Sequence, residues 1–227
     1  MQSSNLITSD LRMCLVEGNR DFQFLTIYRG VQFVCFAELQ AVTEERAYFV
    51  VRSGNPILLA RDRSAVALSN GLIDPFVIQV ASFEMTTGKL EAADMVYAGD
   101  TVGNRREHRV AADPSVMVDV DWEDQKLRGN LLDLSLSGAG ICIPFSETSV
   151  DFRRGKTFWL TLHLPEGGVQ LPGTILRYQK RPNCHWFAVE FTGKAPGKVA
   201  ILHHINRRLS EIRAEVQQMY AEAQKNT

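Results

Sequence analysis

Two groups of polar residues in the second half of the chain have the types and spacing needed to bind a small anion. The first lies in residues 132–138 (LDLSLSG), where three leucines alternate with Asp133, Ser135 and Ser137. Because side chains on a strand alternate between its faces, the leucines are predicted to face a core. Asp133 and Ser135 then project together from the other face, roughly 7 Å apart. Gly138 ends the run, where a Cβ would hinder a turn or the close approach of another group.

A carboxylate and a hydroxyl held on one strand face form a platform of hydrogen-bonding groups. A carboxylate accepts from two neighbouring N–H donors at once, and the N1–H and N2–H₂ edge of guanine offers such a pair. The pattern therefore favours a guanine-containing ligand. Taken alone, the same segment also fits the solvated outer face of an ordinary strand.

The second group is basic, with Arg105, Arg106 and Arg109 following the polar, glycine-bearing stretch 99–104. Guanidinium groups bind phosphate bidentately, match the O6/N7 edge of guanine and stack on bases. On a flexible linker they could fold over a ligand on the strand face, so that binding fixes the placement of two domains. The alternative is a solvated charge cluster. The R-x-x-x-R spacing does not decide between a ligand-binding and a solvated cluster, because Arg177 and Arg181 have the same spacing.

The elements that must position these groups are predicted to be mainly β-strands. Residues 22 to about 98 form short segments rich in Val, Ile, Phe and Tyr, separated by Gly and Asn turns. Residue 62 to residue 68 could be strand or helical turn. Five further strand segments follow: VMVDVDW, LRGNLLDLSLSGAGICI, TFWLTLHL, VQLPGTILRY and HWFAVEF. We therefore expect two small antiparallel β-barrels or split barrels, at residues 1–103 and 104–227, joined by the arginine-bearing linker.

A helix is predicted from about residue 197 to the C-terminus. Its apolar residues recur at spacings of three and four: Leu202, Ile205, Leu209, Ile212, Val216, Met219 and Ala223. This seven-residue repeat forms a narrow stripe, which favours pairing with another helix. A homo-oligomer assembled through this helix is therefore expected. The alternative is that the helix packs on its own domain.

Composition and missing motifs limit the classes of function. The 25 Lys and Arg residues nearly balance the 26 Asp and Glu residues, so no overall field favours nucleic acid or membrane surfaces. No stretch is apolar enough for a signal peptide or membrane span, which predicts a cytoplasmic protein without membrane insertion. The four cysteines are far apart and are expected to be reduced and mostly buried.

Neither an enzyme nor a metal site is expected. The chain has no H-E-x-x-H, G-x-S-x-G or phosphate-binding G-x-x-x-x-G-K-[ST] motif, so we predict no catalytic residue, metal ligand or cofactor. His203 and His204 adjoin each other on the predicted helix, where they point about 100° apart and are expected to be solvated. Asp119, Asp121 and their acidic neighbours lack calcium-loop spacing and are interpreted as a polar turn.

At the candidate residues the chain resembles the PilZ domain family, whose members are cytosolic receptors for cyclic di-GMP. The family signature is R-x-x-x-R followed by [D/N]-x-S-x-x-G, and it is matched by Arg105, Arg109, Asp133, Ser135 and Gly138. The resemblance covers residues 104 to 193. It implies cyclic di-GMP as ligand, with the arginines on phosphates and guanine edges, and Asp133 and Ser135 on a guanine.

The resemblance also implies weaker expectations. Arg106 would add to the phosphate grip, and Arg177 would stack on a base. Ala188 stands where relatives commonly have glycine, which could narrow the site. The order of strands before residue 104 resembles the two-domain flagellar-brake type of PilZ protein.

The expected function is therefore that of a receptor whose domains rearrange on ligand binding. It would regulate an unidentified protein partner, such as the flagellar motor or polysaccharide synthesis machinery, in motility, biofilm or polysaccharide output. An alternative is a ligand-independent assembly scaffold on the same fold. A DNA-binding regulator is disfavoured by the neutral charge.

Overall fold

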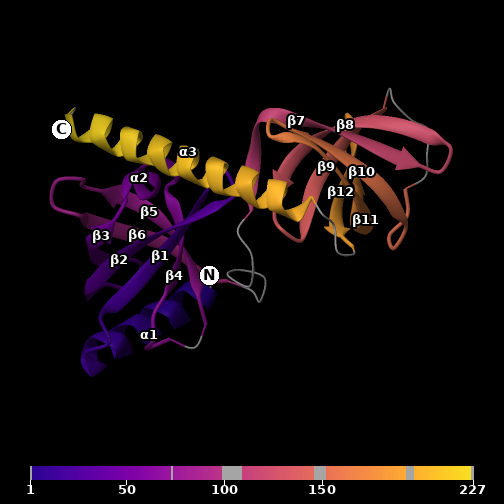
Figure 1. Ribbon diagram of the computed structural model, residues 1–227. Helices are drawn as coiled ribbons and strands as arrows, with labels where there is room; N and C mark the ends of the chain where they lie inside the picture. Colours follow the sequence, from indigo (N-terminus) through magenta and orange to yellow (C-terminus); the bar gives the residue numbers. More distant parts are fainter. Residues whose placement is uncertain (1, 73, 99–108, 146–151, 193–196, 226–227) are drawn as a thin grey trace. The chain divides into compact units, whose positions relative to one another are not determined.

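The computed structural model describes residues 2–72, 74–98, 109–145, 152–192 and 197–225, and the chain divides into two compact units (Figure 1). The first unit comprises the described residues up to Tyr28, those from Gln32 to Ala98, and those from Ile212 onward. The second comprises Arg29–Val31 and the described residues between 109 and 211. The predicted boundary between residues 103 and 104 lies outside the described residues.

The first unit is a closed barrel of six antiparallel strands in the order β1-β2-β3-β6-β5-β4. Four phenylalanines fill its core with edge-to-face contacts: Phe22, Phe24, Phe49 and Phe76. Helix α1 (Gln2–Glu17) contacts β6 and adds Ile7 and Leu11 to this core. The strands are β1 (Asp21–Tyr28), β2 (Val31–Val42), β3 (Ala47–Gly54), β4 (Ser64–Leu68), β5 (Phe76–Phe83) and β6 (Lys89–Tyr97).

One expected strand of the first unit is instead a helix. Residues 56–60 (PILLA) are an apolar run within the stretch predicted to form strands, but helix α2 (Ile57–Asp62) begins in this run. Pro56 is its N-cap, where a fixed φ suits the start of a helix, and the Asn55 side chain accepts the first N–H. Arg63 then ends the helix in the left-handed region, and β4 follows at once. The ambiguous stretch after residue 62 is therefore a strand.

The second unit is also a closed six-stranded antiparallel barrel, in the order β10-β11-β12-β9-β8-β7. Its strands are β7 (Val110–Trp122), β8 (Gln125–Leu134), β9 (Gly138–Pro144), β10 (Thr157–Leu164), β11 (Gly167–Lys180) and β12 (Cys184–Phe191). Aromatic rings pack inside it, with Trp122 against Phe152 and Phe158, and Phe187 against both phenylalanines. The mainly β fold with two barrels and a C-terminal helix is confirmed.

The C-terminal helix α3 (Lys198–Lys225) belongs in part to each unit, with the division after Glu211. Of the predicted apolar stripe, Ile205, Ile212 and Val216 are buried within the chain, whereas Leu202 is exposed. Within the first unit, the Tyr28 hydroxyl donates to Glu215 Oε1 at 2.6 Å. The chain itself therefore covers much of the stripe, and self-association through α3 stays a prediction. Among the described helices, none has the length and apolar character to cross a membrane.

The prediction of reduced cysteines is wrong for two of the four. Cys142 in β9 and Cys184 in β12 are joined by a disulfide, with their Cα atoms 6.0 Å apart. The two strands are neighbours in the barrel, and this adjacency was hidden by a sequence separation of 42 residues. Cys14 and Cys35 are free and buried, as expected.

Candidate functional site

An ion pair links two of the predicted site residues on the second barrel. Arg109 lies directly before β7, and Asp133 lies in the adjoining strand β8 opposite Ala111. Arg109 Nη1 donates to Asp133 Oδ1 at 2.7 Å, and the side chains are 30% and 33% exposed. This charge-assisted bond holds the two groups side by side while leaving them accessible from solvent. Arg105 and Arg106, the other linker arginines, lie outside the described residues.

A row of cross-strand partners extends the site from this ion pair to Arg177. Asp133 in β8 is opposite Gly140 in β9, which is opposite Ala188 in β12, and Ala188 is opposite Arg177 in β11. Such partners share one face of a sheet. Three strand spacings separate Arg177 from Asp133, about 14 Å in all. The row therefore places a carboxylate and two guanidinium groups around a floor of one glycine and one alanine.

Gly140 is a site residue that the sequence reasoning missed. A Cβ built on it would lie 2.6 Å from Asp133 Oδ2 and 3.1 Å from Asp133 Cγ. Any side chain at residue 140 would therefore push the carboxylate away from its present position. The signature contains no residue at this place, and only the pairing of β8 with β9 brings it against Asp133.

Ser135 does not project beside Asp133, which corrects the expected arrangement. Strand β8 ends at Leu134, and Ser135 is buried in the turn that follows, 1% exposed. Its N–H donates to the carbonyl of Gly138 at 2.8 Å, and its hydroxyl donates to the same oxygen at 3.2 Å. In this structure Ser135 therefore shapes the turn that connects β8 with β9.

Gly138 is required at the end of this turn for a steric reason. A Cβ on it would lie 2.2 Å from the carbonyl oxygen of Val189 in the neighbouring strand β12. The Phe191 N–H donates to Ser137 O at 2.8 Å and holds the same two segments together. The expectation that a Cβ would hinder the close approach of another group agrees with this geometry.

The three leucines around Asp133 do not all face the core. A β-bulge interrupts the pairing of β8 with β9 between Leu131 and Asp133. Of the three predicted leucines, Leu134 is buried, Leu136 is half-buried and Leu132 is 37% exposed, because the extra residue shifts the alternation at Leu132. The bulge lies directly before Asp133, and such irregularities redirect side chains at sites.

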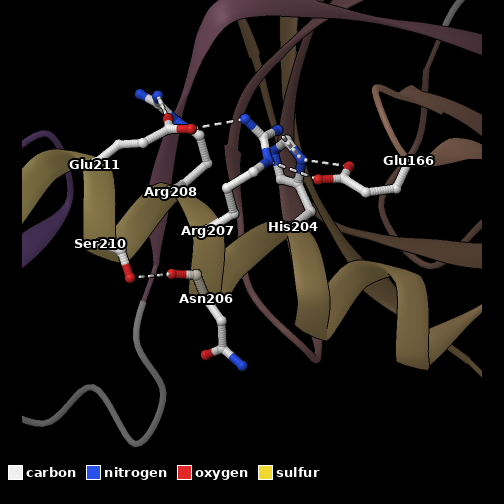
Figure 2. Close-up of polar contacts among 7 residues, drawn as sticks. All are labelled: Glu166, His204, Asn206, Arg207, Arg208, Ser210 and Glu211. Atoms are coloured by element: carbon white, nitrogen blue, oxygen red, sulfur yellow. Dashed lines mark hydrogen bonds and ion pairs between the residues drawn. The ribbon is translucent and has the colours of Figure 1, made fainter.

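A second polar cluster joins the start of α3 to the turn between β10 and β11 (Figure 2). Glu166 accepts from Arg207 Nε at 2.7 Å and lies 3.1 Å from His204 Nδ1. Partial burial opposes ionisation of Glu166, but Arg207, a backbone N–H and His204 outweigh it and lower its pKa to about 2. His204 is buried, so its expected solvation is wrong, whereas His203 is exposed.

Asp119 and Asp121, which were expected in a polar turn, lie in strand β7, and only Glu123 and Asp124 form the turn. Asp119 accepts from Arg128 Nε at 2.9 Å and lies 2.7 Å from His163 Nε2. The bond from Arg128 is the main reason that the pKa of Asp119 lies below its usual value. Within the described parts of the chain, no three His, Cys, Asp or Glu side chains are grouped closely enough to bind a metal ion.

Comparison with known proteins identifies the second barrel. Residues 103–206 match the model of the PilZ domain family, so this part of the chain is a PilZ domain. No curated protein sequence matches the chain. Arg109, Asp133, Ser135, Gly138 and Arg177 all lie inside the matched segment.

Several solved structures resemble the whole chain at low sequence identity. YcgR of Escherichia coli, in complex with c-di-GMP, is 16% identical with a TM-score of 0.44, and the alignment covers 99% of this chain and 96% of that one. The Bacillus subtilis inhibitor of motility MotI/DgrA is 12% identical with a TM-score of 0.43, covering 85% and 97%. The MrkH–c-di-GMP complex of K. pneumonia is 10% identical with a TM-score of 0.44, covering 96% and 97%. The assignment rests on the family match.

Proposed function

We propose that the chain is a receptor for cyclic di-GMP, without catalytic activity. The observation that carries this proposal is the Arg109–Asp133 ion pair, because both residues belong to the signature and face a floor of small residues inside the PilZ segment. The Asp133 carboxylate would accept from the N1–H and N2–H₂ edge of a guanine. Arg109 and, across the row, Arg177 would bind phosphate or stack on a base.

The ion pair explains how the free site stays ready for its ligand. Both side chains are about one-third exposed, so water screens their attraction and the pair contributes only about 0–1 kcal/mol. A ligand that offers a guanine edge to Asp133 and a phosphate to Arg109 therefore has little to break. The pair meanwhile favours, by a similarly small amount, the rotamers in which both side chains lie at the site, which lowers the ordering cost of binding slightly.

The finer parts of the function extend this proposal. The linker with Arg105 and Arg106 would close over the bound nucleotide, and the domains 1–103 and 104–227 would change their arrangement. The altered protein would act on a cytoplasmic partner in motility, biofilm or polysaccharide output. The order of two barrels flanking an arginine-bearing linker supports a flagellar-brake type of receptor. Homo-oligomerisation would use the exposed part of α3, including Leu202.

Isothermal titration with cyclic di-GMP tests the proposal, with GTP as the nucleotide control. Arg109→Ala should lower the affinity about 10- to 150-fold, because a hydrogen bond to a charged group is lost. Arg128→Ala is the matched control, since Arg128 also pairs with an aspartate on the same barrel but lies outside the row. It should bind like the wild type.

Two results would refute the receptor function. One is wild-type protein that takes up no cyclic di-GMP and gains no thermal stability from it. The other is an equal loss of affinity in Arg109→Ala and Arg128→Ala, which would indicate a nonspecific charge effect. In either case the alternative function, a ligand-independent assembly scaffold, would remain. Loss of self-association in Leu209→Ala would then support that alternative.

A further inference from the structure

The turn between β1 and β2 has an unusual backbone. It consists of Arg29 and Gly30, with φ angles of 49° and 81°. Two-residue turns with both angles positive normally carry Asn-Gly or Asp-Gly, because a side chain at the first position is strained there. Arginine in this position costs free energy, and such strain persists where the surroundings require it. The surroundings of this turn are therefore informative.

The turn lies against the backbone of Arg109, within the second unit. Arg29–Val31 belong to that unit, although the strands on either side belong to the first. The Ala111 N–H donates to the carbonyl of Arg29 at 2.9 Å. A Cβ built on Gly30 would lie 2.9 Å from the carbonyl oxygen of Arg109 and 3.4 Å from the nitrogen of Ala111. Gly30 thus touches the main chain of a site arginine.

This contact bears directly on the site described above. Ala111 is the cross-strand partner of Asp133, and Arg109 is the ion-pair partner of Asp133. The atoms that a Gly30 side chain would strike are backbone atoms, which cannot swing aside as the end of a flexible side chain can. Either the turn or the main chain of Arg109 would have to shift, and a shift of Arg109 would carry its guanidinium with it.

We propose that Gly30 is a positioning residue of the ligand site, acting through Arg109. Because Gly30 has no Cβ, the main chain of Arg109 can lie where the Arg109 guanidinium reaches Asp133 Oδ1. The Arg29 carbonyl accepts from the Ala111 N–H and so holds the start of β7 in place. This inference rests on the proposed function, since its readout is affinity for cyclic di-GMP. Arg29 contributes to this positioning through its backbone carbonyl, which accepts the hydrogen bond from Ala111.

Three variants separate the contact from the backbone strain. Gly30→Ala adds a Cβ and also strains the backbone, because alanine disfavours the positive φ of this residue. Gly30→Asn adds the same Cβ, but asparagine tolerates a positive φ. Gly155→Ala is the matched control: Gly155 also lies in the second unit, has a φ of 84°, and has no atom within 4 Å of its built Cβ. Both Gly30 variants should lose about tenfold in affinity, and Gly155→Ala should keep its affinity.

A double-mutant cycle shows whether Gly30 acts through Arg109. In an Arg109→Lys background, Gly30→Ala should lower the affinity less than about twofold, because the affected group is already altered. An additive loss in that background would overturn the proposal, as would Gly30 variants that bind like the wild type. If the wild-type protein itself binds no cyclic di-GMP, the proposed receptor function is refuted, and the positioning role of Gly30 is refuted with it.

Discussion

Replacing Gly140 with alanine should weaken binding of cyclic di-GMP while leaving the second barrel folded. The new Cβ would lie 2.6 Å from Asp133 Oδ2, well inside contact distance, and the carboxylate is the end of a side chain that can rotate. We therefore expect Asp133 to turn away from Arg109 and from the floor of the site. The perturbation does not remove a charge or touch the arginines.

The expected magnitudes differ between the free and the bound protein. In the free protein the partly exposed ion pair contributes about 0–1 kcal/mol, and alanine in a strand regains roughly 0.5–1 kcal/mol over glycine. The free energy of unfolding should therefore change by no more than about 1 kcal/mol. In the complex, a misplaced carboxylate loses its paired hydrogen bonds to guanine, which costs about 1–3 kcal/mol or roughly 5- to 150-fold in affinity.

Titration calorimetry and denaturant unfolding on the same preparations measure both quantities. Gly168→Ala is the matched control, because Gly168 also lies in a strand of this barrel and its built Cβ meets no atom within 4 Å. A Gly140→Ala protein with wild-type affinity would refute the assigned role of Asp133. So would an affinity loss that Gly168→Ala shares, or one that accompanies unfolding of the barrel.

Two further predictions concern the stability of the second unit. The pKa of Glu166 is about 2, below its ordinary value of 4.5, so its contribution to stability is complete above about pH 4.5 and is lost as the pH falls toward 2. Thermal unfolding of wild type and Glu166→Gln should thus differ most near neutral pH and converge in acid, and a gap independent of pH would contradict this. Reduction of the Cys142–Cys184 disulfide, which closes a loop of 42 residues, should lower the unfolding free energy by about 4 kcal/mol. Mass spectrometry that finds four alkylated thiols without a reductant would exclude the bond.

The strands could be predicted from sequence because their signal is local. Val, Ile, Phe and Tyr alternate with polar residues between glycine turns, and this pattern depends only on neighbours along the chain. Arg109 and Asp133 could be selected as candidates for the same reason, since they belong to a short signature of the PilZ family that the chain resembles. The segment 56–60 misled because a short apolar run fits a buried strand or a buried helix equally well.

The rest depends on contacts between distant segments. Gly140 becomes part of the site only because β8 pairs with β9, and Gly30 only because its turn meets Arg109. The burial of Ser135 follows from a bulge and a strand end that alternation cannot show. His204 was expected in solvent because nothing in the sequence links it to Glu166. Each of these features requires the strand order and register.

The closure of both barrels limits how a protein partner can be recognised. Each strand of the two described barrels has a hydrogen-bonded neighbour on both sides, so no open sheet edge remains among them. A partner that contributed an extra strand, which is a common route for binding extended peptides, would therefore have to displace one of these neighbours. We expect a partner of this chain to use side chains on the barrel faces, loops or helices instead.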